Sequence, residues 1–251
     1  MTSTSANTDA STLRDALRVA LGFAAVKLAM HFALTLWTQH LGYGYFRDEF
    51  YYIACGRHLA WGYVDHGPIV ALQARLGELL FGDSLFSIRI LSAVAGAAAV
   101  FLTGVLAWAF GGRRPAQALA MLGVIVCPQY IAFDGFLSMN SFEPVFWMTC
   151  VLALVLMLGG HSRRLWWLVF GVSAGIGLLN KPSMTFFLAA VGVGLLLTQE
   201  LFGAFPAAKL RRDRKSHNLR PQRSVAEGPA VSLDPRPAQP ENALVPLGHC
   251  A

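Results

Sequence analysis

The side chains best suited to chemistry in this sequence lie in a polar stretch between residues 42 and 68. The stretch holds two adjacent acids, Asp48 and Glu49, and a second polar pair, Asp65 and His66, among several tyrosines. A carboxylate within hydrogen-bond reach of a hydroxyl can accept its proton as a general base. Cations or a metal ion can stabilise the negative charge that grows on a leaving group. We therefore predict that this stretch forms one wall of an active site.

The composition indicates that this site belongs to an integral membrane protein. Of the 251 residues, 55% are hydrophobic and 14% are charged, whereas soluble domains carry about 25% charged residues. Long apolar runs account for the difference. Residues 1–12 lack the basic segment and cleavage site of a signal peptide, so the first apolar run is predicted to be a retained span. The tail from Lys209 onward supplies +4 of the net charge of +6, which argues against a nucleic-acid partner.

The apolar runs predict an all-α membrane protein with about six transmembrane helices. Several runs are shorter than the ~20 residues that a span usually needs. The six predicted helices cover residues 16–37, 87–110, 117–135, 143–159, 165–180 and 184–205. The long loop after the first helix is predicted to contain two short helices, 48–60 and 68–81, of which the second is amphipathic and suited to lie at the membrane interface.

Basic residues at alternate connections predict how the helices are oriented. Arginine or lysine clusters precede the first helix and follow the second, fourth and sixth. Short basic loops stay in the cytoplasm, so residues 1–15 form a cytoplasmic N-terminus and residues 16–205 the membrane domain. The Pro- and Arg-rich tail, 206–251, is predicted to be disordered. The same alternation gathers the unusual polar residues at the outer face, which is where a site is expected.

Each candidate residue has a structural explanation beside the functional one. Asp48 could cap the helix that follows it, and Asp65–His66 could form a solvated turn. Lys181 and Arg89 could extend to the interface instead of binding a phosphate. Glu143 is best explained by helix capping. Asp134, a lone acid at the end of an apolar run, is expected to line the site near Asp48.

Several ordered motifs resemble the N-terminal half of bacterial polyprenyl-phosphate-sugar glycosyltransferases of the GT-C class. These are the protein-mannosyltransferase-like and aminoarabinose-transferase-like enzymes. The resemblance rests on residues 45–52, 58–68, 82–93, 138–144 and 178–184. It implies a GT-C-like fold that is truncated here, because family members have further spans. Gly67-Pro68 stands where the family usually has a Pro-Pro pair.

The resemblance also implies a reaction and a location. Family members transfer a sugar from a polyprenyl-phosphate donor to a lipid, glycan or protein acceptor, at the outer face of the bacterial cytoplasmic (inner) membrane. The expected roles are general base for Asp48, with Glu49 as its partner. By its position, Asp134 is added as a third catalytic acid.

For the donor phosphate, we predict contacts from His66, Lys181 and Arg89. Asp65 is the candidate ligand for a divalent metal ion, the one cofactor that the pattern leaves open. Two alternatives remain: a catalytically inactive fragment, or a small transporter subunit, which would carry its acids at the centres of the spans.

Overall fold

The apolar runs form helices throughout the part of the chain that is described. The structure is a computed structural model that describes residues 3–159 and 163–197. Its helices are α1 (Ser3–His40), α2 (Arg47–Arg57), α3 (Pro68–Phe81), α4 (Leu85–Ala109), α5 (Arg114–Val126), α6 (Pro128–Asp134), α7 (Met139–Leu158), α8 (Arg163–Asn180) and α9 (Met184–Leu197). These residues contain no strand, so the prediction of an all-α membrane protein is confirmed. The predicted tail, 206–251, lies outside the described residues.

Three of these helices are long and apolar enough to cross a membrane: Leu13–His40 within α1, α4 and α7. The pair α5 and α6, bent by 62° at its junction, passes the same test together and corresponds either to a broken span or to a re-entrant loop. The apolar helices α8 and α9 are shorter, with 14 residues described in α9. Within the described residues, the six predicted apolar segments are helical, residues 198–205 of the last lying outside them, and the two predicted loop helices appear as α2 and α3.

The prediction of one continuous helix over residues 117–135 is wrong, because the chain breaks between Val126 and Pro128. Cys127 has an extended backbone, with φ −65° and ψ 120°, and Pro128 begins α6. Proline has no amide N–H to donate and clashes with the preceding turn, so it favours the start of a new helix over continuation of the old one. Lys27 of α1 donates a hydrogen bond to the carbonyl oxygen of Tyr130 in α6, 3.4 Å away, so the segment after the break is tied to α1.

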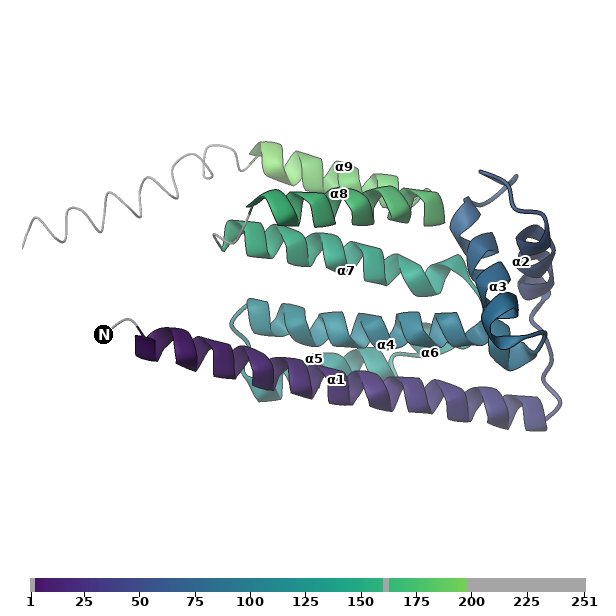
Figure 1. Cartoon of the computed structure of the whole chain (residues 1–251), viewed down its shortest axis with the longest axis horizontal. Helices are drawn as coiled ribbons and strands as arrows, with labels where there is room; N and C mark the ends of the chain where they lie inside the picture. Colours follow the sequence, from purple (N-terminus) through teal and green to yellow (C-terminus); the bar gives the residue numbers. More distant parts are fainter. Residues whose placement is uncertain (1–2, 160–162, 198–251) are drawn as a thin grey trace, which may run out of the picture. The chain divides into compact units, whose positions relative to one another are not determined.

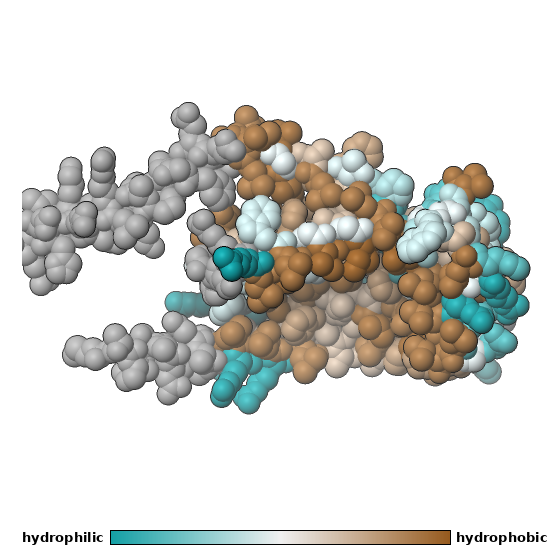
Figure 2. Space-filling model, turned by 45° about the horizontal axis from the view of Figure 1, so that its top comes forward, coloured by the Kyte–Doolittle hydropathy of each residue, from teal (hydrophilic) through white to brown (hydrophobic). Residues whose placement is uncertain are grey.

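The long helices α1, α4, α7, α8 and α9 run roughly side by side, and α2 and α3 lie across one end of them (Figure 1). All belong to one compact unit that ends at Leu197. Hydrophobic side chains cover much of the length of the helices, whereas hydrophilic ones gather at the end formed by α2 and α3 and also occur at the opposite end (Figure 2). This distribution suits a bundle whose sides contact lipid and whose α2–α3 end contacts water.

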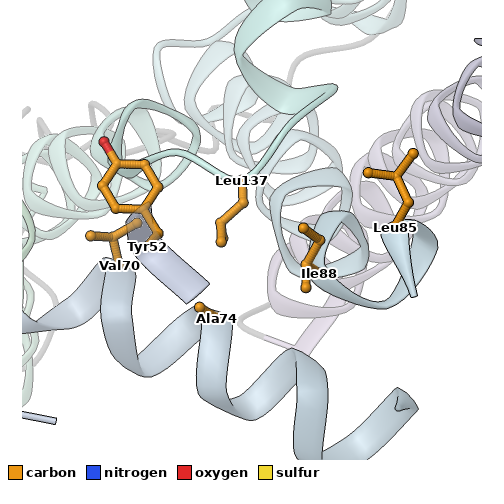
Figure 3. Packing of buried hydrophobic residues seen from close by; sticks show 6 residues of the cluster. All are labelled: Tyr52, Val70, Ala74, Leu85, Ile88 and Leu137. Carbon is orange, nitrogen blue, oxygen red and sulfur yellow. The ribbon is translucent and has the colours of Figure 1, made fainter. Parts of the chain in front are cut away.

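A cluster of buried apolar side chains fixes α2 and α3 to the bundle (Figure 3). Its members are Tyr52, Val70, Ala74, Leu85, Ile88 and Leu137. The helices approach closely through glycine: a Cβ on Gly77 would lie 2.9 Å from the carbonyl oxygen of Ser87. Ser84 caps α4 by accepting a hydrogen bond from the Ser87 amide at 3.1 Å. The α2–α3 layer is therefore a fixed platform rather than a loose loop.

Candidate functional site

Asp48 lies in the first turn of α2 with 41% of its side chain exposed. Its carboxylate accepts a hydrogen bond from Arg47 Nε at 3.3 Å. The N-cap residue is Phe46, so the alternative that Asp48 caps the helix is wrong. The partial positive charge at a helix N-terminus favours an ionised carboxylate in this position. Asp48 is therefore placed as an accessible negative charge at the water-facing end of the bundle.

Glu49, the next residue, is completely buried and holds four hydrogen bonds. Arg89 donates Nε to Oε1 and Nη2 to Oε2, both at 2.8 Å. The amide of Leu137 donates to Oε1 at 2.9 Å, and the amide of Phe46 donates to Oε2 at 2.7 Å. Both carboxylate oxygens are thus doubly engaged. Glu49 joins α2 to α4 and to the segment before α7, which suits a positioning role better than proton transfer.

Arg89 is therefore a partner of Glu49 as well as a candidate for phosphate contact. Its Nη2 also donates to the carbonyl oxygen of Gly44 at 3.1 Å. Two-pronged pairing of a guanidinium with a carboxylate fixes both side chains in orientation. Among the described residues, Nη1 of Arg89 has no hydrogen-bond partner, so this edge of the guanidinium keeps its donors.

The Asp65–His66 pair is divided between water and the protein interior. Tyr51 donates its hydroxyl to Asp65 Oδ1 at 2.8 Å, and this hydrogen bond raises the pKa of Tyr51 to about 12. His66 is buried among the rings of Tyr51, Tyr52 and Tyr63, with centroid distances of 5.3, 5.2 and 4.6 Å. Asp65 matches the predicted solvated turn, whereas His66 does not.

The hydrogen bonds of His66 determine its tautomer. Nδ1 lies 2.7 Å from the carbonyl oxygen of Gly67. Because a carbonyl only accepts, Nδ1 must carry the proton, and Nε2 is the acceptor nitrogen of the neutral ring. Nε2 is buried and has no partner in the described part of the chain. It is available to a ligand that offers a donor.

Lys181 links the end of α8 to the start of α7. Its Nζ donates to Asn140 Oδ1 at 2.8 Å and to Glu143 Oε2 at 2.9 Å. Glu143 also accepts from Ser183 Oγ. Ser138 caps α7, so the prediction of a capping role for Glu143 is wrong. Two of the three donors of Lys181 are used within the protein.

A close approach joins the Asp65–His66 turn to the end of α8. A Cβ built on Gly67 would overlap the carbonyl oxygen of Leu179, which only glycine avoids without movement of the backbone. This contact gives a physical reason for glycine at this position. It also brings the turn that carries His66 close to the residues just before Lys181.

Asp134 lies inside the bundle, where its carboxylate contacts α1. Oδ2 is 3.1 Å from Lys27 Nζ and 3.8 Å from His31 Nε2, and the three side chains are at most 2% exposed. Gly96 on α4 makes room for the carboxylate, which a Cβ there would meet at under 3 Å. The charged partner of Asp134 is therefore Lys27, in the middle of α1. Asp134 was expected near Asp48, but the described contacts of Asp134 do not include Asp48.

Lys27 and His31 were not predicted from the sequence. The available signal was their spacing of four residues inside an apolar helix, which places them on one face. Lys27 stands near the middle of the span Leu13–His40. A lysine at that depth is costly unless it is paired, and its burial therefore implies a partner on a neighbouring helix.

A cavity of about 410 Å³ lies between α1, α6 and the segment that precedes α2. Arg89 is the predicted site residue on its wall. His31 also lines it, so the cavity extends from the outer segment toward the Lys27–Asp134 pair. The remaining wall is mostly apolar and aromatic: Leu34, Thr35, Thr38, Tyr43, Gly44, Tyr45, Phe46, Ile131, Ala132, Gly135 and Phe136.

The described residues contain no group of three or more His, Cys, Asp or Glu side chains that could hold a metal ion. Asp65 offers one carboxylate oxygen already bonded to Tyr51. A single carboxylate beside one histidine does not fit the donor set of a protein-bound divalent ion. The groups that this site offers for chemistry are therefore its own side chains.

Comparison with known proteins identifies relatives of this chain. The family described as dolichyl-phosphate-mannose-protein mannosyltransferase matches residues 65–205, more than half of the sequence. Two curated relatives from Pseudomonas aeruginosa, strains UCBPP-PA14 and LESB58, are named undecaprenyl phosphate-alpha-4-amino-4-deoxy-L-arabinose arabinosyl transferase. They are 34% and 33% identical over 126 residues, covering 45% of this chain and 21% of each relative. No solved structure matches.

Proposed function

The chain belongs to the dolichyl-phosphate-mannose-protein mannosyltransferase family, and from this premise we propose that it transfers a sugar from a polyprenyl-phosphate donor to an extracytoplasmic acceptor. The names of the two relatives support a lipid-phosphate-linked sugar as donor. The matched region spans about a fifth of the length of those relatives. The transfer reaction of the whole relatives is therefore part of what we propose for this chain.

The observation that carries the proposal is the position of Asp48 beside Glu49, whose four hydrogen bonds form what we call the Glu49 clamp. Glu49 fixes the first turn of α2 through four hydrogen bonds, while Asp48 in the same turn keeps 41% of its side chain exposed. Groups held in a fixed orientation lose little entropy when they react. We assign Asp48 as the general base that accepts the acceptor's proton during attack on the anomeric carbon, with Glu49 as its positioning residue.

The groups assigned to the donor phosphate differ in what they can still offer. Lys181 keeps one donor free of the bonds to Asn140 and Glu143, and its positive charge is partly offset by Glu143. His66 offers Nε2, a buried acceptor without a partner among the described residues, to a donor group of the substrate. The close contact of Gly67 with Leu179 supports a common role for these two side chains. Asp65 orients Tyr51 in this proposal and is not needed as a metal ligand.

We infer the direction of the bundle in the membrane from its charged ends. Arg114, at the start of α5, donates to Asp15 Oδ2 at 2.5 Å near the N-terminal part of α1. This basic end lies opposite α2 and α3 (Figure 1). Because short basic loops remain in the cytoplasm, we place the N-terminus inside and Asp48 at the outer face of a bacterial inner membrane.

The test compares Asp48→Asn with Asp48→Glu in the full chain reconstituted in lipid vesicles. Transfer is measured from a radiolabelled polyprenyl-phosphate-linked arabinose or mannose to lipid and protein acceptors. Loss of a general base is expected to lower kcat by about 10²- to 10⁴-fold, with little change in KM. Asp48→Glu keeps the carboxylate and should retain part of the activity.

Asp83→Asn is the matched control, because Asp83 is also an acid at this end of the bundle and its side chain is 78% exposed. It should transfer sugar at the wild-type rate. Unchanged kcat in Asp48→Asn would remove Asp48 as the base. Absence of transfer by the wild-type chain would instead favour the alternative of an inactive fragment.

A further inference from the structure

A second cavity, of about 260 Å³, lies at the end of the bundle opposite α2 and α3, between the start of α1, the end of α4 and the start of α5. Its charged wall residues are Asp15, Arg113 and Arg114. Arg114 donates to Asp15 Oδ2 at 2.5 Å. Arg113 is exposed and makes no hydrogen bond or ion pair with the described residues. This cavity therefore holds an arginine whose charge no described side chain offsets.

An apolar cavity of about 460 Å³ lies next to it, between α1 and α5. Arg18 is the charged residue on its wall. The rest of the wall is formed by Val19, Gly22, Phe23, Val26, Leu122 and Ile125. The two cavities adjoin at Asp15, which lines the first and has its carboxylate 3.7 Å from Arg18 Nη1 in the second. Together they form one groove with a basic end and an apolar body, which we call the α1–α5 groove.

The walls of the α1–α5 groove are fixed from behind and open in front. Ala20 of α1, Val100 of α4 and Met121 of α5 pack in one buried cluster that holds the three helices together. On the groove side, Val26 is 59% exposed, and a Cβ built on Gly22 would meet nothing within 4 Å. Exposed apolar surface beside polar groups marks an interaction site, and along a membrane span its neighbours are acyl chains.

The charges of the groove select an anionic occupant. Three arginines, Arg18, Arg113 and Arg114, face a single acid, Asp15, which leaves two positive charges without a counter-charge. A second copy of this chain bound through the same groove would bring identical arginines together. The segment 209–215 of this chain has five basic residues and one acid, so it carries the same sign of charge as the groove. Like charges in contact oppose association, which disfavours both of these occupants.

The position of the arginines separates this groove from the site proposed for the sugar donor. Arg18 and His40 are 22 residues apart on α1, a distance of about 33 Å along a helix. That is close to the thickness of the hydrocarbon core of a bilayer, about 30 Å. The groove therefore opens at the membrane face opposite α2 and Asp48. Basic pockets between helices at the cytoplasmic face are typical binding sites for the head groups of anionic phospholipids.

We propose that the α1–α5 groove binds an anionic glycerophospholipid of the membrane, with its phosphate at Arg18 and Arg113 and one acyl chain against Gly22, Val26 and Ile125. This lipid is a bound partner of the fold and takes no part in sugar transfer. The assignment goes beyond the proposed function and requires no role for Asp48. Only the leaflet, which is the cytoplasmic one, follows from the orientation inferred above.

The experiment counts lipids bound to the detergent-solubilised full chain by native mass spectrometry. The probes are phosphatidylglycerol, phosphatidylcholine with the same acyl chains, farnesyl phosphate and inorganic phosphate. One basic residue near an anionic head group is worth about a fivefold change in affinity. Two uncompensated charges should therefore make phosphatidylglycerol bind about 10- to 30-fold more tightly than phosphatidylcholine. Added salt should reduce this preference, because the arginines are exposed.

Two arginine variants test the head-group contacts. Arg18→Gln and Arg113→Gln should each weaken phosphatidylglycerol about fivefold and leave phosphatidylcholine unchanged. Arg164→Gln is the matched control, since Arg164 is also exposed, at the start of α8, and lines neither cavity. It should bind phosphatidylglycerol like the wild type.

Gly22→Leu tests the apolar body of the groove. The leucine side chain would occupy the space for the acyl chain, so this variant should bind both phospholipids at least tenfold more weakly. Gly171→Leu on α8 is the matched control, because Gly171 is likewise exposed with nothing within 4 Å of a Cβ. Leucine has a higher helix propensity than glycine, so both variants should keep or raise the thermal midpoint. Lost binding at an unchanged midpoint separates a blocked groove from a damaged fold.

Five results would overturn the inference. Equal binding of the two phospholipids would mean that the groove does not select charge. Inorganic phosphate as tight as phosphatidylglycerol would make it a site for a free anion, and tighter farnesyl phosphate would make it a prenyl site. Wild-type affinity in both arginine variants would remove the head-group contacts. A dimer that Gly22→Leu abolishes while phosphatidylglycerol still binds would identify a second copy as the occupant. Asp48→Asn should bind phosphatidylglycerol normally, so this test fails or succeeds separately from the activity assay.

Discussion

Replacement of Glu49 by alanine should destabilise the protein more than any exposed acid at the same end. The change removes the acceptor of four hydrogen bonds and leaves the Arg89 guanidinium without its counter-charge. It also leaves the amides of Phe46 and Leu137 without the carboxylate that they now contact. The joint between α2, α4 and the start of α7 would therefore lose its central group.

The structure sets the expected magnitude. Removing one partner of a buried ion pair costs about 3–5 kcal/mol. Arg89 is 8% exposed and lines the cavity, so water can reach part of the freed guanidinium. We therefore expect a cost of about 3 kcal/mol, at the lower end of that range. For a chain of this size, such a loss corresponds to a fall in the thermal midpoint of about 6–12 °C.

The assay follows thermal unfolding of the detergent-solubilised protein by circular dichroism, with reversible unfolding in mixed micelles as an independent measure. Glu49→Gln keeps an oxygen that can accept from the two amides, so its loss should be smaller than that of Glu49→Ala. The double variant Glu49→Leu/Arg89→Met replaces the ion pair by apolar groups and should recover much of the stability. Asp15→Asn breaks an exposed pair with Arg114 and should cost about 1 kcal/mol or less.

A cost below about 1 kcal/mol for Glu49→Ala would refute the clamp, because that is the range of exposed pairs. A double variant no more stable than Glu49→Ala would show that apolar packing cannot replace the charges. The first of these results would remove the positioning role assigned to Glu49. The reactivity of Asp48 would then need another source of orientation.

Two further predictions concern the loop that carries Asp65 and Gly67. Gly67→Ala should lower the thermal midpoint, because its Cβ would overlap the backbone of Leu179, whereas Gly62→Ala has open space and should not. Because Tyr51 has a pKa raised to about 12, its contribution to stability should be fully present below pH 10 and be lost as pH rises through 12. Phenolate absorbance of the wild type minus that of Tyr51→Phe measures this titration, and Asp65→Asn should return the midpoint toward 10.

Much of the fold could be predicted because its signals are local. The apolar runs marked each helix, and the amphipathic pattern marked α3 at its observed bounds, Pro68–Phe81. The break at Pro128 was also readable, since proline inside an apolar run favours a helix end. The prediction nevertheless placed one helix across Pro128. The bend depends on what the next helix contacts, which a local pattern does not contain.

The sequence identified several residues of the candidate site, but it did not identify the residues with which they pair. Acidity and position identified Asp48 and Glu49 together, but the burial of Glu49 depends on Arg89, which is 40 residues away in the sequence. The pairing of Lys181 with Glu143 likewise joins two helices, over 38 residues. Which of two adjacent acids faces water is decided by the rotation of α2 on its apolar cluster. That rotation is a property of packing, and sequence spacing alone leaves it open.

The Lys27–Asp134 pair is the strongest argument for a different function, and its surroundings favour a structural role. Ionisable groups at mid-span are what a transporter would need. Here, however, the two charges are 0% and 2% exposed, and Lys27 also bonds the backbone of the broken span at Tyr130. Pro128 leaves that span with fewer internal hydrogen bonds, and free backbone carbonyls are costly within a membrane. A paired lysine at this depth compensates for the break and ties α6 to α1. Ile131 and Ala132 of α6 line the same cavity as His31, so the bend that this pair holds in place also shapes that cavity.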